Sequence, residues 1–317
     1  MFLENETNMI LAKRIFLGRL EECLYFPKYF EIETVNFCNA RCIMCTIGAW
    51  QGRKKKVMSE DLFSKFAKEV SSYSDWIETV CLARDGEPTL DPQLVSRVRM
   101  LKQAGIKKVT FSTNGQLLAK RLSEELIRAG LDDIMVSLDG ITKETFEKIR
   151  LRLNYETVLN NTLELIRLRN TINPQMSIRV RMIVINENRH EVDDWLDFWG
   201  KQVSRQDKVY AMPAHTWGSQ LKEESACLVT LCADKPCVSL FSTITMHVDG
   251  KIGLCGVDYS PKNIMGDFSK QSLKNIWVGE AFNRARQLHT GGRRNEIALC
   301  RGCDLWEREY RFAERQE

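Results

Sequence analysis

Residues 30–45 read FEIETVNFCNARCIMC, a run with the composition of a β-strand that leads directly into three cysteines. Cys38, Cys42 and Cys45 have the spacing C-x3-C-x2-C. Three thiolates this close in sequence can hold three irons of a cubane cluster. No fourth cysteine follows nearby, so the fourth iron would stay open to a small ligand. The alternative is a zinc knuckle or an incidental group of thiols, although zinc would need a fourth ligand.

Strand-like and helix-like segments alternate six times along the chain from this motif. The expected strands cover residues 30–38, 76–83, 108–113, 134–138, 177–185 and 209–213. The expected helices cover residues 59–70, 92–104, 117–129, 142–150, 155–170 and 190–203, the first of them capped by Ser59. This alternation predicts an α/β fold with parallel strands and right-handed crossovers. It fits an open doubly wound sheet or a barrel that stops short of eight repeats.

Polar residues follow the expected strands at the ends where reactive groups gather in such folds. They are Gly86 with Glu87, Thr113 with Asn114, and Ser137 with Asp139. A simple turn or a helix cap is the alternative interpretation of each of these positions.

The pattern changes near residue 215, where we expect a domain boundary. Asp249-Gly250 is a hairpin signal between two strands, and a helix is expected at 272–288. Four cysteines belong to this part, which are Cys237, Cys255, Cys300 and Cys303. Four thiolates suit a closed [4Fe–4S] cluster or a structural zinc ion equally well. The expected domains are an N-terminal helical extension at 1–29, a core at 30–214 and a smaller domain at 215–317.

The composition is that of a globular cytoplasmic protein. The chain has 317 residues, of which 44% are hydrophobic and 28% charged, and no apolar run is long enough to span a bilayer. The formal net charge of +4 does not indicate nucleic-acid binding. Eleven cysteines, mostly grouped, indicate metal or redox chemistry rather than disulfides. Residues 53–56 (RKKK) form either a solvated loop or a guide for an anionic substrate or electron donor.

The motif ETVNFCNARCIMC resembles the cluster loop of the radical S-adenosylmethionine (SAM) superfamily. The resemblance implies a partial (β/α)6 TIM-type barrel, with SAM on the open iron of the first [4Fe–4S] cluster. It also implies that reductive cleavage of SAM gives a 5′-deoxyadenosyl radical. In the family, residues matching Gly86 and Glu87 hold the methionine ammonium. Residues matching Thr113, Asn114 and Ser137 contact ribose and carboxylate, and Arg150 resembles another cofactor-contacting residue, with a surface arginine as the alternative.

The C-terminal segment KPCVSLFSTITMHVDGKIGLCGVDY resembles the short auxiliary-cluster domain (twitch/SPASM-like) of this superfamily. That branch implies one auxiliary [4Fe–4S] cluster on the four C-terminal cysteines, held by the β-hairpin and the helix. It includes dehydrogenases of 2-deoxy-scyllo-inosamine and epimerases of aminoglycosides. We therefore expect dehydrogenation or epimerisation of a sugar or aminocyclitol, with a flavodoxin- or ferredoxin-type electron donor. The alternatives are radical modification of a ribosomally made peptide and a non-catalytic metal-binding or electron-transfer protein.

Two groups of residues have no assigned place in this scheme. Cys227 and Cys232 are either spare thiols or hydrogen-atom donors to a substrate radical, as a cysteine is in the related epimerases. His215 and Trp217 follow the sixth strand and either face the active site or pack at the boundary. Cys81 lies in an apolar strand, and we expect it in the core.

Overall fold

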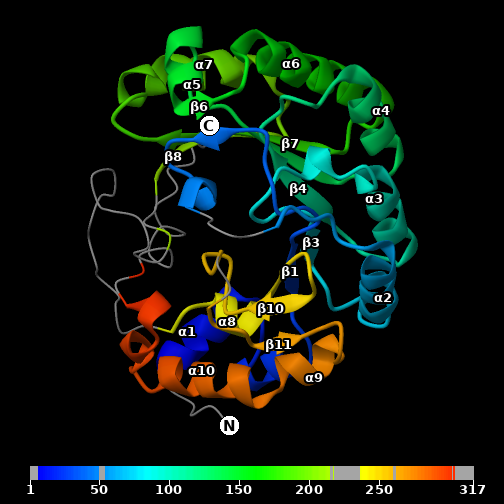
Figure 1. The fold of residues 1–317 in the computed structure, drawn as a ribbon, viewed down its shortest axis with the longest axis vertical. Coiled ribbons are helices and arrows are strands. Elements are labelled where there is room, and N and C mark those ends of the chain that lie inside the picture. The colour runs from blue at the N-terminus through cyan, green and yellow to red at the C-terminus, as the bar shows by residue number, and fades with distance from the viewer. Residues whose placement is uncertain are drawn as a thin grey trace.

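The computed structural model describes residues 6–49, 54–214, 217, 236–259, 262–301 and 303. Figure 1 shows an outer arc of helices around a curved sheet. Six neighbouring strands of this sheet run parallel, and they are β1 (Tyr29–Ile32), β3 (Thr79–Cys81), β4 (Val109–Thr113), β5 (Asp133–Ser137), β7 (Ser177–Val184) and β8 (Lys208–Pro213). The helices of the arc are α2 (Glu60–Ser71), α3 (Leu94–Gln103), α4 (Lys120–Arg128), α5 (Lys143–Ile149), α6 (Tyr155–Ile172) and α7 (Val192–Gln202). The predicted α/β fold with a partial barrel of six β/α units is confirmed.

The two faces of the barrel strands differ because side chains alternate along a strand. In β1 the buried residues are Phe30 and Ile32, and the Phe30 ring packs edge-on against Phe66 of α2. In β7 the buried residues likewise alternate, and they are Ile178, Val180 and Met182. Apolar side chains therefore form the core between the sheet and the helices, and the alternate positions, such as Tyr29 and Glu31, face inward.

The C-terminal part of the chain continues the barrel sheet at its other edge. Strand β9 (Thr243–Met246) pairs in parallel with β1, and β10 (Lys251–Gly253) and β11 (Gly266–Asp267) follow it in antiparallel order. Gly250 turns the predicted hairpin with φ of +85°, a conformation that glycine adopts without strain. The parallel pairing of β9 with β1 could not be foreseen from the hairpin signal.

The remaining elements are short. Helices α1 (Glu6–Arg14), α8 (Ser239–Ser242), α9 (Leu273–Trp277) and α10 (Glu280–Thr290) lie at the end of the molecule that carries β10 and β11 (Figure 1). A separate two-stranded sheet joins β2 (Arg41–Cys42) to β6 (Arg150–Leu151). The short 3-10 helices are η1 (Leu20–Leu24), η2 (Thr46–Ala49), η3 (Pro88–Leu90), η4 (Arg189–Glu191), η5 (Arg294–Glu296) and η6 (Ala298–Cys300).

Some expected elements are shorter or divided in the structure, among them the strand expected at 76–83, of which only Thr79–Cys81 is strand. The expected strand 30–38 ends at Ile32, since the following residues form a loop whose Glu33 carboxylate accepts a hydrogen bond from Val248 N at 2.8 Å. The expected helix 272–288 is divided into α9 and α10, because Gly279 adopts extended backbone before α10 begins. None of the helices in the described ranges is long and apolar enough to cross a membrane.

Candidate cofactor and cluster sites

The first cysteine loop follows β1 and is fixed by local backbone bonds. Cys45 N donates to Cys42 O at 3.0 Å, and Cys42 lies opposite Arg150 in the β2–β6 ladder. Ala40 N donates to Cys38 Sγ at 3.3 Å, and Arg150 Nη1 donates to Cys42 Sγ at 3.5 Å. These donors suit thiolate ligands, whose negative charge they stabilise.

The electrostatics of the loop depend on this grouping of sulfur atoms. Burial, against the opposing bond from Ala40 N and together with the nearby Glu87, Cys42 and Cys45, raises the pKa of Cys38 to about 12. Burial likewise raises the pKa of Cys45, with Cys42 adding to the rise and Arg150 opposing it. Bound iron would compensate such crowded thiolates. The three predicted ligands are thus brought together and fit a cluster with one open iron.

Gly86 and Glu87 pack directly against the cysteine loop. A Cβ at Gly86 would lie 2.2 Å from Val35 O and 2.8 Å from Phe37 O, so only glycine fits this contact. Glu87 N donates to Phe37 O at 2.9 Å. The strand end that carries Gly86 is therefore held against the loop that presents the cysteines.

The Glu87 carboxylate is 3% exposed and joins two strand ends. It accepts hydrogen bonds from Thr113 Oγ1 at 2.6 Å, Asn114 N at 2.8 Å, Thr89 Oγ1 at 2.7 Å and Thr89 N at 3.2 Å. Burial raises its pKa, and these donors oppose the rise. Asn114 Nδ2 continues the network to Asn39 Oδ1 at 2.7 Å and to Cys38 Sγ at 3.7 Å.

A buried ion pair lies on the other side of the cysteine loop. Arg150 Nε donates to Asp139 Oδ2 at 2.5 Å, and the Asp139 Oδ1 atom accepts from Ile183 N at 2.7 Å. Arg150 is 9% exposed, which excludes the alternative of a surface arginine. Ser137, at the end of β5, accepts a hydrogen bond from Arg181 Nη2 at 3.1 Å. Of the predicted residues, Glu87, Asn114 and Arg150 therefore contact the cysteine loop directly.

The structure also brings the four C-terminal cysteines together. Burial raises the pKa of Cys255, and Cys237, Cys300 and Cys303 all add to the rise. Cys255 follows β10 in the hairpin, whereas Cys300 and Cys303 come from the loop that begins at η6. Cys303 N donates to Cys300 O at 3.3 Å, which closes that loop. Four thiols in mutual electrostatic reach fit the predicted closed cluster.

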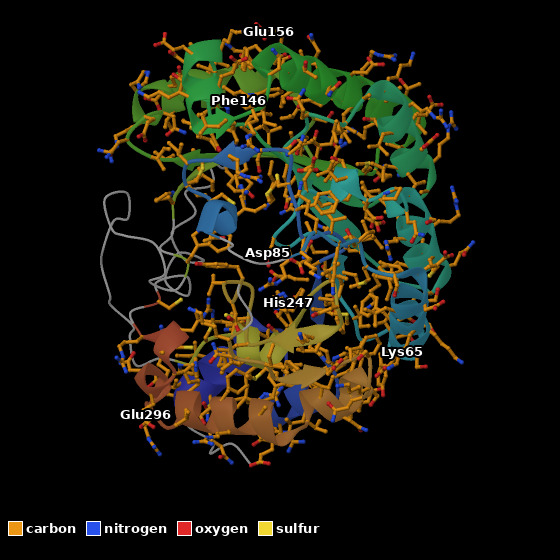
Figure 2. All side chains as sticks on the ribbon, in the orientation of Figure 1. Lys65, Asp85, Phe146, Glu156, His247 and Glu296 are labelled. Atoms are coloured by element: carbon orange, nitrogen blue, oxygen red, sulfur yellow. The ribbon has the colours of Figure 1, made fainter. Side chains whose placement is uncertain are left out.

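A group of buried charges between the two cysteine sets was missed by the sequence analysis. Ligand atoms of Glu33, Asp85 and His247 lie within 4.8 Å of one another, and the Arg84 guanidinium pairs with Asp85 and lies 3.4 Å from His247 Nδ1. Figure 2 places Asp85 and His247 near the middle of the molecule, between the arc of helices and the C-terminal elements. These residues follow β1, β3 and β9, and the unforeseen pairing of β9 with β1 brings them together. The only sequence signal was the position of Arg84 and Asp85 directly before Gly86.

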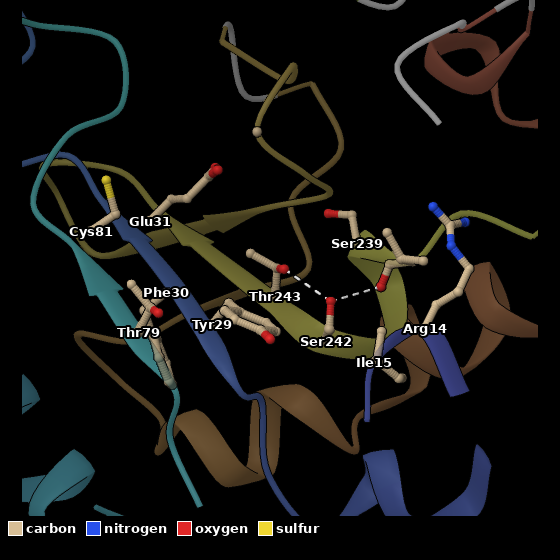
Figure 3. Close-up of a pocket in the computed structure, with 12 residues that line it drawn as sticks. Arg14, Ile15, Tyr29, Phe30, Glu31, Thr79, Cys81, Ser239, Ser242 and Thr243 are labelled. Atoms are coloured by element: carbon tan, nitrogen blue, oxygen red, sulfur yellow. Dashed lines mark hydrogen bonds between the residues drawn. The ribbon is translucent and has the colours of Figure 1, made fainter. Parts of the chain in front are cut away.

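A cavity of about 420 Å³ with a mixed polar and apolar lining lies on the inner face of β1, β3 and β9 (Figure 3). Its lining includes Tyr29, Glu31, Cys81, Ser242 and Arg14. Cys81 packs against the core, as expected, but it also borders this cavity, and burial raises its pKa to about 12.

Some expected residues cannot be placed. Cys227, Cys232 and His215 lie outside the described residues. Trp217 packs against the core and makes an edge contact with Tyr259, with ring centroids 6.4 Å apart.

A curved parallel sheet with an open three-thiol loop at its carboxyl end and a second four-thiol site defines an iron–sulfur enzyme of the partial-barrel class. The model of the radical SAM superfamily matches residues 32–198, and that of the SPASM iron–sulfur cluster-binding domain matches residues 237–304. The chain belongs to the radical SAM superfamily. Its cofactors are SAM and two [4Fe–4S] clusters, one that binds SAM and one auxiliary.

Curated relatives match only part of the chain. A probable GTP 3′,8-cyclase of Saccharolobus islandicus is 34% identical over 169 residues, which are 53% of this chain and 51% of the relative. A protein of Pyrococcus furiosus that modifies the cofactor of a tungsten-containing aldehyde ferredoxin oxidoreductase is 32% identical over 112 residues, 35% of this chain and 31% of that protein. The chain thus spans about half the length, or less, of these relatives.

Solved structures share the fold over most of the chain. BtrN in complex with AdoMet and 2-DOIA has a TM-score of 0.61 at 17% identity, covering 88% of this chain and 93% of that one. SuiB of Streptococcus suis bound to its precursor peptide SuiA has a TM-score of 0.65 at 14% identity, covering 96% and 76%. The enzyme anSMEcpe with bound AdoMet has a TM-score of 0.61 at 13% identity, covering 83% and 84%.

Proposed function

We propose that the protein removes a hydrogen atom from a small carbohydrate-like or aminocyclitol substrate and so dehydrogenates or epimerises it. When bound, the first cluster and SAM supply the 5′-deoxyadenosyl radical, and the auxiliary cluster supplies a one-electron acceptor. The observation that carries this proposal is the four-thiol site of Cys237, Cys255, Cys300 and Cys303 in the part of the chain that the structure describes. The likeness to BtrN, a protein solved with an aminocyclitol ligand, supports the same substrate class.

The two reactions differ in what happens after hydrogen abstraction. Oxidation of a secondary alcohol to a ketone removes one hydrogen atom, then one proton and one electron, and this electron needs an acceptor. Epimerisation instead returns a hydrogen atom to the opposite face of the same carbon. We propose Cys227 and Cys232 as candidate donors for that step, and the four-thiol site favours the dehydrogenase.

We assign the cofactor contacts to the residues around the first cysteine loop. The polar ends of β3, β4 and β5 would receive SAM at Gly86, Glu87, Thr113, Asn114, Ser137 and Arg150. The Glu87 carboxylate already accepts four hydrogen bonds from the chain. A carboxylate offers about four acceptor positions, so all of them are in use. We propose that the methionine ammonium replaces one of the two donors of Thr89, which is more exposed than Thr113 and Asn114. The other three bonds would keep Glu87 in place.

We further propose that a reduced flavodoxin- or ferredoxin-type protein delivers electrons at the cysteine loop in the cytoplasm. Lys54, Lys55 and Lys56 are exposed beside this loop. Asn36, just before Cys38, holds them there: its Nδ2 donates to Lys54 O at 2.9 Å, and its Oδ1 accepts from Lys56 N at 2.6 Å. Positive charges at this place suit an acidic protein partner.

We also propose a domain boundary near residue 215.

Product analysis tests the reaction. Reconstituted, reduced protein is incubated without oxygen with SAM and with aminocyclitols, amino sugars, GTP or peptides, in H₂O and in D₂O. We expect 5′-deoxyadenosine formation that an aminocyclitol or a sugar stimulates, together with a two-electron-oxidised product. Deuterium incorporation without net oxidation would identify the epimerase instead. Stimulation by GTP alone would refute the proposed substrate class, and failure to cleave SAM would favour a non-catalytic metal protein.

Radical modification of a ribosomally made peptide is the second candidate. The likeness to SuiB with its precursor peptide favours it, and that likeness covers 96% of this chain. It also covers only 76% of SuiB, against 93% of BtrN. Stimulation by peptides and by no small molecule in the same assay would establish this candidate over the first.

A further inference from the structure

Two buried arginines reach the auxiliary cysteine site from opposite sides. Arg84 follows β3 of the barrel, and its side chain is 1% exposed. Arg294 begins η5, after the last long helix, and it is 2% exposed. A buried guanidinium has a high desolvation cost, so it is found where acceptors or negative charge compensate it.

Both arginines donate to backbone carbonyls of the ligand loops. Arg84 Nη2 donates to Asp258 O at 2.7 Å and to Cys255 O at 3.4 Å. Arg294 Nη2 donates to Cys303 O at 2.7 Å and to Cys300 O at 3.3 Å. Three of the four cysteines in the set therefore have a carbonyl bonded to a buried guanidinium, and we call Arg84 and Arg294 the arginine pair.

The fourth cysteine is held without adding charge. Cys237 N donates to His289 Nδ1 at 3.1 Å. Because this Nδ1 atom accepts a hydrogen bond, it carries no proton, and the ring is uncharged. The arginine pair therefore places two buried positive charges beside these cysteines.

Acidic groups around Arg84 hold its charge in this position. Its Nη1 pairs with Asp85, and Glu33, Glu31 and Asp258 also stabilise the guanidinium electrostatically. Removing Arg84 would take away a positive charge that these carboxylates share, so their negative charge beside the cysteine site would be less well compensated. The loss of the positive charge and the remaining negative charge would both make the surroundings of the four cysteines more negative.

We propose that the arginine pair raises the reduction potential of the auxiliary cluster and thereby makes it an electron acceptor. A cluster on four thiolates is anionic, and reduction adds one electron and one more negative charge. Fixed positive charges in a buried, low-dielectric site stabilise the reduced form more than the oxidised one. Net charge, hydrogen bonding and exposure are the levers that set such potentials. This inference does not depend on the substrate, because the cluster potential can be measured without one.

The test is a redox titration of the reconstituted holoenzyme followed by electron paramagnetic resonance, with dithionite as the reductant. The signal that changes when SAM is added belongs to the first cluster, and the other signal belongs to the auxiliary cluster. In Arg84→Gln and in Arg294→Gln we expect the auxiliary reduction equilibrium to fall at least tenfold, or 59 mV for one electron. The reduction potential of the first cluster should stay unchanged in both variants. The auxiliary potential should also stay unchanged in Arg301→Gln, which removes an exposed charge next to Cys300.

The variants differ in what they remove. Glutamine keeps an amide donor and loses the charge, whereas lysine in Arg84→Lys and Arg294→Lys keeps the charge and loses the two-pronged fork. An unchanged auxiliary potential in both glutamine variants would overturn the proposal, as would an equal fall in Arg301→Gln. If the glutamine variants do not hold about eight irons, the lysine variants test the proposal instead. The reduction equilibrium of their auxiliary cluster must then stay within tenfold of the wild-type value, and a larger fall overturns the proposal.

Discussion

Replacing Gly86 with alanine would place a methyl group against the backbone of the first cysteine loop. The added Cβ would lie 2.2 Å from Val35 O and 2.8 Å from Phe37 O. Both atoms belong to the main chain, so no side chain can rotate away to relieve the contact. The strand end at residues 86–87 must instead move away from the loop, and the 2.9 Å bond from Glu87 N to Phe37 O lengthens or breaks.

The size of the effect follows from these two changes. Overpacking by one methyl group costs about 1–3 kcal/mol, and loss of a backbone hydrogen bond adds about 1 kcal/mol. The free energy of unfolding should therefore fall by roughly 2–4 kcal/mol, out of about 5–15 kcal/mol for a typical domain. A displacement of about 1 Å at a reacting centre can also slow SAM cleavage by about 100-fold.

The assay compares Gly86→Ala with Gly200→Ala as the matched control. Gly200 lies in α7, and no atom lies within 4 Å of a Cβ added there, so alanine should leave stability unchanged or raise it by up to about 1 kcal/mol. Urea unfolding reports stability, and the rate of 5′-deoxyadenosine formation reports SAM cleavage. Wild-type stability and cleavage in Gly86→Ala would refute the close packing described for the cofactor site.

Three further changes test other parts of the account. Asp139→Asn removes the charge that pairs with the buried Arg150 and should lower the free energy of unfolding in urea by about 3–5 kcal/mol. Glu164→Gln, which breaks the exposed pair with Arg167, should lower it by at most about 1 kcal/mol. Equal losses in the two variants would contradict the burial argument. Burial lowers the pKa of folded His289 to about 4, below the ordinary 6.5, so the unfolded chain binds the extra proton between these values and stability falls as the pH drops. Between pH 7 and 5.5 the wild type should lose about 1 kcal/mol more than His289→Gln, and equal losses in the two proteins would contradict the burial of the imidazole. Cys81, whose pKa burial raises to about 12, should resist iodoacetamide at pH 8 in the folded protein and react after unfolding in urea; rapid alkylation of the folded form would show that the thiol is more accessible than described.

The sequence alone predicted the features that depend on neighbouring residues. The spacing of Cys38, Cys42 and Cys45 predicted that the three thiols share one loop, which the structure has. Ser59 was correctly expected as a helix cap, and its side chain accepts the Leu62 N–H at 3.3 Å. Strand and helix periodicity gave the order of the barrel elements, because each depends on a local pattern.

Features that depend on distant segments were not predictable in this way. The parallel pairing of β9 with β1 joins residues more than 200 positions apart, and it brings His247 to Glu33 and Arg84. Arg84 and Arg294 contact the same cysteine set from parts of the chain that are far apart in sequence. Neither has a spacing that marks it as part of a site. Such arginines and carboxylates look like ordinary surface residues until the fold buries them.

The central claim is that the chain holds two clusters on two separate sets of cysteines. Anaerobic iron and sulfide analysis of the reconstituted protein tests it most directly, with a Cys38/Cys42/Cys45→Ala triple variant beside the wild type. We predict about eight irons and about eight sulfides per chain, falling to about four of each in the triple variant. About four irons in the wild type with zinc at the second site, or no loss in the triple variant, would contradict the account.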